Sequence, residues 1–312
     1  MAEKIKKSIP GFMFLVLAGV IVMISFSSVW PLKTPGVKAE TTTTFTPQVT
    51  VGNATPTVSS VELTPSPIVL TDNTTTTVTC TATINDTDGG TTISAATGTI
   101  YRSDVGSSCS SDDNSCYPDN TCTLSAADGN NKYATCTADI WFHADPTDAG
   151  TYEGQTWQCY VIAEDDQGAT DSDTDTTPPE LNTLAALTIT SSIDYETLFA
   201  GATSSSSKTT TATTTGNTAI DVKIRGTDME KDGGATIPGA QQEYATSSVD
   251  YGLGTDMSTT TYVALELESL KPVQHNPVQA TATDDILWRI GIPVDQVSGI
   301  YYGTTTVAAQ AD

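Results

Sequence analysis

Residues 107–122 read SSCSSDDNSCYPDNTC, a stretch that brings cysteines and aspartates close together in the chain. Thiolates and carboxylates at this density could bind a metal ion, run a redox cycle or form disulfides. The choice depends on the compartment, because disulfides persist in oxidising environments and are rare in the cytosol. The rest of the sequence therefore has to indicate where these residues fold.

The N-terminus predicts export. Three lysines among the first seven residues precede an uncharged apolar run at residues 9–30, which is long enough to span a bilayer as a helix. The same segment fits a secretory signal with a V-x-A cleavage site before Glu40. We expect residues 1–39 to be either a cleaved signal peptide or an uncleaved N-terminal hydrophobic helix that anchors the chain in the membrane. In both cases the remainder is exported.

All six cysteines lie within residues 80–159, and an even count in an exported chain indicates disulfides. Zinc is the alternative for the inner four, but their C-x6-C-x5-C-x13-C spacing lacks the tight pairs that zinc sites use. Cys122 and Cys136 flank a predicted hairpin tip, so we expect the pair Cys122–Cys136. The pair Cys109–Cys116 would then close a small acidic loop.

The chain beyond the apolar run has the pattern of an all-β protein. Residues 40–58 are Thr-rich and Pro-punctuated, which indicates an exposed stalk. Short runs of alternating apolar and polar residues follow, separated by turn residues, as in β-sandwiches. The strongest predicted strands lie at residues 77–84, 133–142, 156–164, 218–226, 262–270, 286–294 and 298–309.

An acidic Pro-Pro stretch at residues 171–182 indicates a linker, or the end of one domain running into the next. We therefore expect two tandem Ig-like β-sandwich domains, at residues 59–176 and 177–312. Cys80 and Cys159 alternate with apolar residues in an early and a late strand of the first domain. This arrangement resembles the inter-sheet disulfide of immunoglobulin-like domains, which implies the pair Cys80–Cys159.

Acidic loops are the best candidates for a metal site. NDTDGG at residues 85–90 and EDDQGA at residues 164–169 each follow a predicted core strand. In an Ig-like sandwich these loops lie at one end, where carboxylates could converge on calcium, a cation that prefers oxygen ligands. The alternative is ordinary turn chemistry, which also favours Asp, Asn and Gly. The candidate calcium ligands are Asp86, Asp88, Asp165 and Asp166, with weaker candidates in residues 227–234 and 111–116.

Other candidate sites are few. Asn53, Asn73 and Asn85 begin N-x-T sequons, which could be glycosylated, although a Thr-rich chain produces such triplets by chance. The two histidines, His143 and His275, are far apart in the chain, and we interpret His143 as a residue at a strand end bonded to nearby backbone. The sequence contains no H-E-x-x-H, phosphate loop or nucleophile elbow.

Charge excludes one class of partner. The formal net charge is −24, with 13 Lys and Arg against 37 Asp and Glu. Binding to phosphate backbones needs clusters of Lys and Arg, so we expect no nucleic-acid partner. A surface of this sign keeps the chain soluble and could attract cations.

Several stretches together resemble a known group of proteins. They include CSSDDNSCY, YATCTADIWFHADPTDA, TGNTAIDV, DDILWRIGIP and SGIYYGT. The chain is similar over nearly its whole mature length to uncharacterised, exported Ig-like and fibronectin-like cell-surface proteins of ultra-small, uncultured bacteria and archaea. The resemblance implies location and fold, and it brings no activity or catalytic residues.

The sequence predicts an exported structural or adhesive protein of the cell surface, without enzymatic activity and without a cofactor other than the calcium considered above. Expected partners are the cell envelope, other surface proteins or further copies of the chain, with the N-terminal helix in the membrane. One alternative is a subunit of an extracellular filament or surface layer, assembled when an exposed sheet edge accepts a strand from the next copy. A secreted hydrolase is a further alternative, but no nucleophile–base pair or metal centre supports it.

Overall fold

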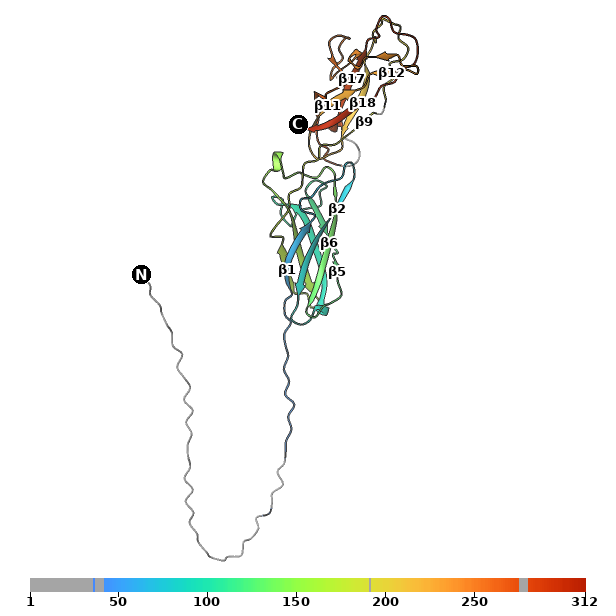
Figure 1. The fold of residues 1–312 in the computed structure, drawn as a ribbon. Coiled ribbons are helices and arrows are strands. Elements are labelled where there is room, and N and C mark those ends of the chain that lie inside the picture. The colour runs from blue at the N-terminus through green and yellow to red at the C-terminus, as the bar shows by residue number, and fades with distance from the viewer. Residues whose placement is uncertain (1–35, 37–41, 191, 275–279) are drawn as a thin grey trace, which may run out of the picture. The chain divides into compact units, whose positions relative to one another are not determined.

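The computed structural model describes residues 36, 42–190, 192–274 and 280–312 (Figure 1). These residues form β-strands joined by loops and short 3₁₀ turns, and no α-helix occurs among them, so the predicted all-β class is confirmed. The predicted helix and cleavage site within residues 1–40, like His275, lie outside this part of the chain. No helix within the described ranges has the length and apolar character needed to cross a membrane.

Residues 51–312 form one compact unit that contains two separate clusters of buried apolar side chains. The first cluster belongs to strands β1–β8, here called the first sandwich. The second belongs to strands β9–β18, here called the C-terminal region. Residues 42–50 belong to a separate unit and are exposed without regular secondary structure.

The first sandwich consists of two four-stranded antiparallel sheets. One sheet has the order β1 (Thr57–Thr64), β2 (Thr75–Asn85), β6 (Asn131–Trp141) and β5 (Thr123–Leu124) (Figure 1). The other has the order β4 (Cys116–Asp119), β3 (Ile93–Arg102), β7 (Trp157–Asp165) and β8 (Thr170–Thr174).

The core of the first sandwich lies between these sheets. In β2, Val78, Cys80, Ala82 and Ile84 are buried and the threonines between them lie on the other face, as the alternation in the sequence predicts. Trp157 in β7 is fully buried and contributes the largest side chain to this cluster. Burial of apolar area at about 25 cal/mol per Å² makes such a two-layer core the main source of stability.

All six cysteines are oxidised, in the pairs expected from the sequence: Cys80–Cys159, Cys109–Cys116 and Cys122–Cys136. Cys80 lies opposite Cys136 in the ladder between β2 and β6, so two disulfides are neighbours in the core. Gly98 of β3 faces them from the other sheet, where an added Cβ would lie 2.7 Å from the Cys136 sulfur. Glycine is needed at this position because of that close approach.

The C-terminal region has one five-stranded sheet, one three-stranded sheet and a two-stranded hairpin. The five-stranded order is β15 (Thr255–Asp256), β14 (Gln242–Ala245), β17 (Thr283–Ile290), β10 (Lys208–Thr214) and β9 (Leu187–Ile189). The three-stranded order is β16 (Val263–Ser269), β11 (Ile220–Gly226) and β18 (Thr305–Ala311), and the hairpin pairs β12 (Met229–Glu230) with β13 (Thr236–Ile237). Trp288 and Tyr244 form the aromatic part of its core, with ring centroids 5.5 Å apart.

Several predicted boundaries were wrong. The stretch 171–182, expected to be a linker or the end of the first domain, is the end of the first sandwich, because residues 171–174 belong to the edge strand β8 and Leu181 is fully buried in the first core. The first core therefore extends beyond residue 176, because apolar side chains after the Pro-Pro pair return to it. The predicted closing strand at 298–309 begins only at Thr305, and the strand predicted at 286–294 spans Thr283–Ile290.

Candidate functional site

The acidic loops that were expected to meet at one end of the first sandwich do lie near each other, and a segment before β1 links them. The Asn53 side-chain amide donates to Asp165 Oδ2 at 2.7 Å, and the Ala54 N–H donates to Asp88 Oδ2 at 2.7 Å. Asp166 joins the same end through its N–H, which donates to the Thr92 carbonyl. The predicted stalk at 40–58 therefore ends before Asn53, because this residue is already bonded to the sandwich.

The carboxylates of these loops order turns instead of pointing at a common centre. Asp86 is fully buried, and it accepts the Asp88 N–H and the Thr92 hydroxyl, both at 2.9 Å. Asp165 accepts the backbone N–H groups of Gln167 and Ala169. Their oxygens are thus occupied by donors of the protein itself, which is the turn chemistry considered as the alternative to calcium.

Metal-ligand geometry is sparse in the described part of the chain. There, the one group of three Asp, Glu, His or Cys side chains with ligand atoms within 4.8 Å of one another is Asp119, Cys122 and Cys136. Its two cysteines are joined in a disulfide, so their sulfurs are not thiolates. The predicted calcium ligands Asp86, Asp88, Asp165 and Asp166 do not form such a group.

Hydrogen bonds perturb the titration of Asp165. The hydrogen bond from the Asn53 amide, aided by backbone N–H groups, holds the pKa of the Asp165 carboxyl below its ordinary value. Burial opposes this effect, since Asp165 is almost fully buried, but the hydrogen bonds to the charged form outweigh it. Asp165 is therefore a charged anchor for the segment before β1.

The weaker acidic candidates also have structural partners. Asp112 accepts the Asn114 N–H at 2.7 Å, which closes the turn inside the Cys109–Cys116 loop. In the C-terminal region, Asp228 accepts the Gly239 N–H at 2.8 Å. Both contacts are typical of aspartates that order turns.

The three sequon asparagines differ in how they are held. The Asn53 and Asn85 amide groups donate to Asp165 and Asn131, each at 2.7 Å. Asn73 is exposed, adopts a positive φ of 53° in the turn before β2, and donates its backbone N–H to the Thr215 carbonyl. Of the two exposed asparagines, Asn53 and Asn73, Asn53 is held through its side-chain amide.

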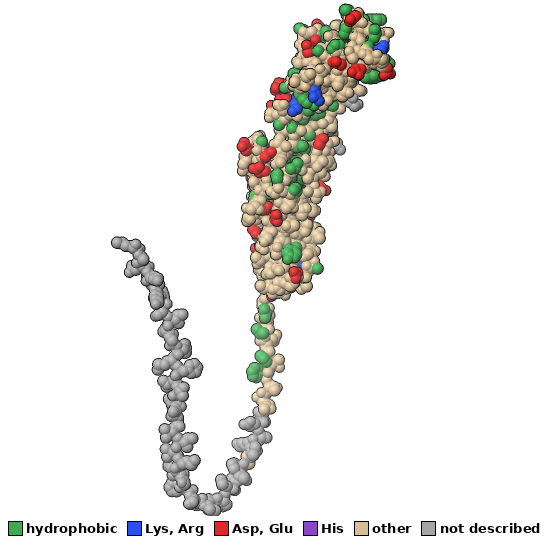
Figure 2. Space-filling view, in the orientation of Figure 1, with side chains coloured by type: hydrophobic (Ala, Val, Ile, Leu, Met, Phe, Trp, Pro, Cys, Tyr) green, Lys and Arg blue, Asp and Glu red, His purple; other side chains and the backbone are tan. Residues whose placement is uncertain are grey.

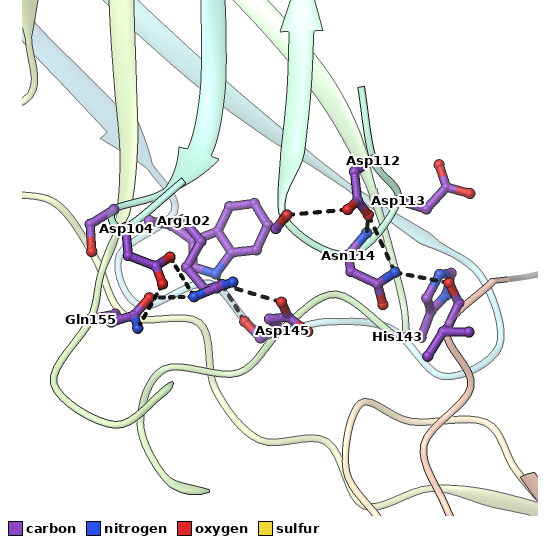
Figure 3. Close-up of polar contacts among 12 residues, drawn as sticks. Arg102, Asp104, Asp112, Asp113, Asn114, His143, Asp145 and Gln155 are labelled. Carbon is purple, nitrogen blue, oxygen red and sulfur yellow. Dashed lines mark hydrogen bonds and ion pairs between the residues drawn. The ribbon is translucent and has the colours of Figure 1, made fainter. Parts of the chain in front are cut away.

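A buried polar cluster, which the sequence analysis missed, lies at the opposite end of the first sandwich (Figure 3). The Arg102 guanidinium donates to Asp145 Oδ2 at 3.2 Å and to Gln155, and it stacks 3.7 Å above the Tyr152 ring. The Trp157 indole N–H donates to the Asp145 carbonyl at 3.0 Å. These contacts come from four separate loops or strands, so no local motif could indicate them.

Lys271 of the C-terminal region completes this cluster. Its ammonium group lies 2.6 Å from Asp145 Oδ1 and also donates to the backbone carbonyl of His143 and to the Asn114 side chain. Asn114 in turn donates to the Val273 carbonyl at 2.8 Å. The loop of residues 111–116, which the sequence predicts as a small acidic loop and a weaker calcium candidate, therefore partly holds the C-terminal region.

His143 follows β6 and is fully buried, with its ring packed against Trp141 and Phe142. Among the residues that the structure describes it is the sole histidine, and no cysteine there is free. A Cys/His or Ser/His/Asp centre needs an accessible base beside a nucleophile. The polar cluster therefore has the features of a structural joint between two β regions.

The C-terminal region contains a cavity of about 220 Å³. Its wall includes Trp288 and Tyr195 together with Thr305 and Val307 of the edge strand β18. The Tyr195 hydroxyl donates to the Gln242 side chain at 3.3 Å, and burial raises the pKa of Tyr195 above its ordinary value. The cavity wall is therefore mixed, with aromatic and apolar side chains beside hydroxyl and amide groups.

Comparisons with protein-family models, with curated proteins and with solved structures found no match.

Proposed function

We propose that this chain is an exported structural or adhesive protein of the cell surface, in which both β regions are Ig-like modules. The observation that carries the proposal is the fully oxidised cysteine set, with two disulfides buried side by side in the first core. Such pairs form and persist in oxidising compartments and are rare in the cytosol.

The strand order of the first sandwich supports the Ig-like assignment. The orders β1-β2-β6-β5 and β4-β3-β7-β8 correspond to A-B-E-D and C′-C-F-G of an immunoglobulin-type domain. In that correspondence the Cys80–Cys159 disulfide joins strands B and F. Two features depart from the pattern. Ile100 of β3 lies opposite Cys159, where strand C of an immunoglobulin-type domain supplies a tryptophan, and Trp157 stands where the tyrosine of the tyrosine corner would be.

The polar side chains also favour a structural role. Asp145 pairs with both Arg102 and Lys271, which connects the two β regions, and the acidic loops hold their own turns. Buried charges that are paired in this way hold a fixed geometry. A spacer or binding platform at the cell surface needs such rigid joints.

Location in cells is the decisive test. Intact cells that produce the full chain would be treated with a membrane-impermeant biotin reagent, with a cytosolic protein as the control. We expect labelling of the chain, no free thiols by mass spectrometry, and an N-terminus at either Met1 or Glu40. An unlabelled protein with free thiols in intact cells would overturn the proposal.

A further inference from the structure

Most sheet edges in this protein are protected against pairing with another chain. β8 carries two aspartates, β16 carries Glu266 and Glu268, β4 contains Pro118, and β5, β9 and β15 are three residues or shorter. Charges, prolines and short edges are the usual protections of natural sheets. The edge strand β1 is closed by side chains, because Asp171 and Asp175 accept the N–H groups of Val58 and Leu63.

β18 has none of these protections. Its sequence, TTVAAQA, has no charge and no proline over seven residues, and within the described residues it pairs only with β11. The Thr227 N–H donates to the Thr304 carbonyl and the Asp312 N–H to the Ala219 carbonyl. Backbone groups in an antiparallel ladder face alternate sides, so the N–H and C=O groups of Thr306, Ala308 and Gln310 face β11. The N–H and C=O groups of the other four residues, Thr305, Val307, Ala309 and Ala311, face the open edge.

The open edge of β18 lies beside the cavity described above. Thr305 and Val307, whose backbone groups face the open edge, also line that cavity. An added strand could therefore form a ladder with β18 and place apolar side chains against Trp288 at the same time.

The same chain contains a segment with the pattern that such an edge accepts. Residues 45–51 read FTPQVTV, with Phe45, Val49 and Val51 between 82% and 86% exposed (Figure 2). These three share one face of an extended chain with Pro47, while Thr46, Gln48 and Thr50 lie on the other. The segment is uncharged in a chain of net charge −24, so it can approach an acidic molecule without repulsion.

Proline fixes which backbone groups of this segment can pair. Pro47 has no backbone N–H to donate. In an extended chain, Phe45, Val49 and Val51 direct their N–H groups to the side on which Pro47 has none. The N–H groups of Thr46, Gln48 and Thr50 are therefore the ones available to β18. The segment can thus form an uninterrupted ladder on one side only, as an edge strand does.

The segment is too short to reach β18 of its own chain. Asn53 is bonded to Asp165 beyond one end of β2, whereas Asn73 contacts Thr215 of the C-terminal region beyond the other end. The eleven residues of β2 span about 35 Å. Eight residues from Asn53 back to Phe45 reach about 28 Å when fully extended. The acceptor must therefore belong to another molecule.

We propose that residues 45–51 of one copy add as a strand to the open edge of β18 in a second copy. The added strand runs parallel to β18, because only in a parallel ladder do residues whose backbone groups face away from β18 share the face of Thr305 and Val307. Val49 then lies at the cavity beside Trp288, and Phe45 and Val51 lie farther along the same face. The pairing is head-to-tail, so it continues from copy to copy and makes a linear assembly. This inference rests on the proposed role at the cell surface, and it names the partner and the surface of contact.

Matched substitutions test the two sides of this contact in the full chain. Val49→Asp places a charge on the face that enters the cavity, whereas Gln48→Asp places the same charge one residue away on the outer face. We expect analytical ultracentrifugation and electron microscopy to show linear assemblies for the wild type and Gln48→Asp, and their loss for Val49→Asp. Ala309→Pro removes an open-edge N–H without touching the β11 ladder, and it should also abolish assembly.

A synthetic peptide of residues 43–52 gives an independent measurement that does not depend on assembly. We expect it to bind the Val49→Asp chain, and to lose binding when the peptide carries Val49→Asp or the chain carries Ala309→Pro. Circular dichroism and thiol content verify that each variant is folded. A monomeric wild type that does not bind the peptide would overturn strand addition. Surface labelling of intact cells is read separately, so failure of this contact and failure of the proposed location are distinguishable.

Discussion

In the first sandwich two disulfides lie within the hydrophobic core and aspartate side chains close the β1 edge, whereas the C-terminal region has no cysteine and keeps both a cavity and an open edge. The first sandwich gains stability from cross-links that restrict the unfolded chain. The C-terminal region depends on side-chain packing around Trp288 and Tyr244. The first sandwich is thus a cross-linked support, and the C-terminal region keeps a strand edge, that of β18, at which a further strand can pair.

Removal of the Cys80–Cys159 disulfide should have the largest effect on this contrast. Replacement of both residues by alanine opens a long loop, which costs about 4–5 kcal/mol of unfolding free energy in the chain-entropy estimate. Denaturant unfolding with hydrogen exchange should show the loss in β2 and β7, with β11 and β17 retaining protection. The control is removal of Cys109–Cys116, whose short loop predicts about 2 kcal/mol. Equal losses for both pairs would contradict the assignment of the first disulfide to the core.

Lys271→Ala tests the joint between the two regions. The substitution leaves the buried Asp145 carboxylate with one cationic partner, Arg102, and a lost hydrogen bond to a charged group costs about 1.5–3 kcal/mol. The matched control is Lys208→Ala, which removes an exposed ion pair with Glu196 and should cost less than about 1 kcal/mol. Equilibrium unfolding of both variants measures the difference. Identical unfolding midpoints for Lys271→Ala and Lys208→Ala would show that the Lys271–Asp145 contact does not stabilise the fold more than an exposed ion pair.

Gly98→Ala tests how tightly the cross-linked core is packed. An added methyl group meets the Cys122–Cys136 disulfide, and overpacking of this kind costs about 1–3 kcal/mol. Gly52→Ala is the control, because an added Cβ at Gly52 has no neighbour within 4 Å. Thermal melting should separate the two variants, and a Gly98→Ala protein as stable as the wild type would mean that the sheets can move apart.

The smallest effect is expected at the segment before β1, and it depends on pH. The folded pKa of Asp165 lies below its unfolded value of about 3.9, so its contribution is complete above that value and is lost as pH falls through the folded pKa. Asn53→Ala removes the main cause and should raise the pKa of Asp165, as an NMR titration would measure. Asn85→Ala, which leaves Asp165 untouched, serves as the control, and an unchanged pKa in Asn53→Ala would refute this cause.

The sequence by itself determined the all-β class, the core strands of the first sandwich and the pairs Cys109–Cys116 and Cys122–Cys136, because alternation and short cysteine spacings are local properties of the chain. The pair Cys80–Cys159, separated by 79 residues, followed from the resemblance to immunoglobulin-like domains. The sequence also indicated that the acidic loops would meet at one end, but not that each carboxylate would be occupied by its own turn. Only the tertiary structure decided the cluster of Arg102, Asp145 and Lys271, whose members are separated by 43 and 126 residues. The same holds for the open edge of β18, since an edge exists only once every strand has its neighbours. Long-range pairing depends on which surfaces remain to be buried, and that is a property of the whole fold.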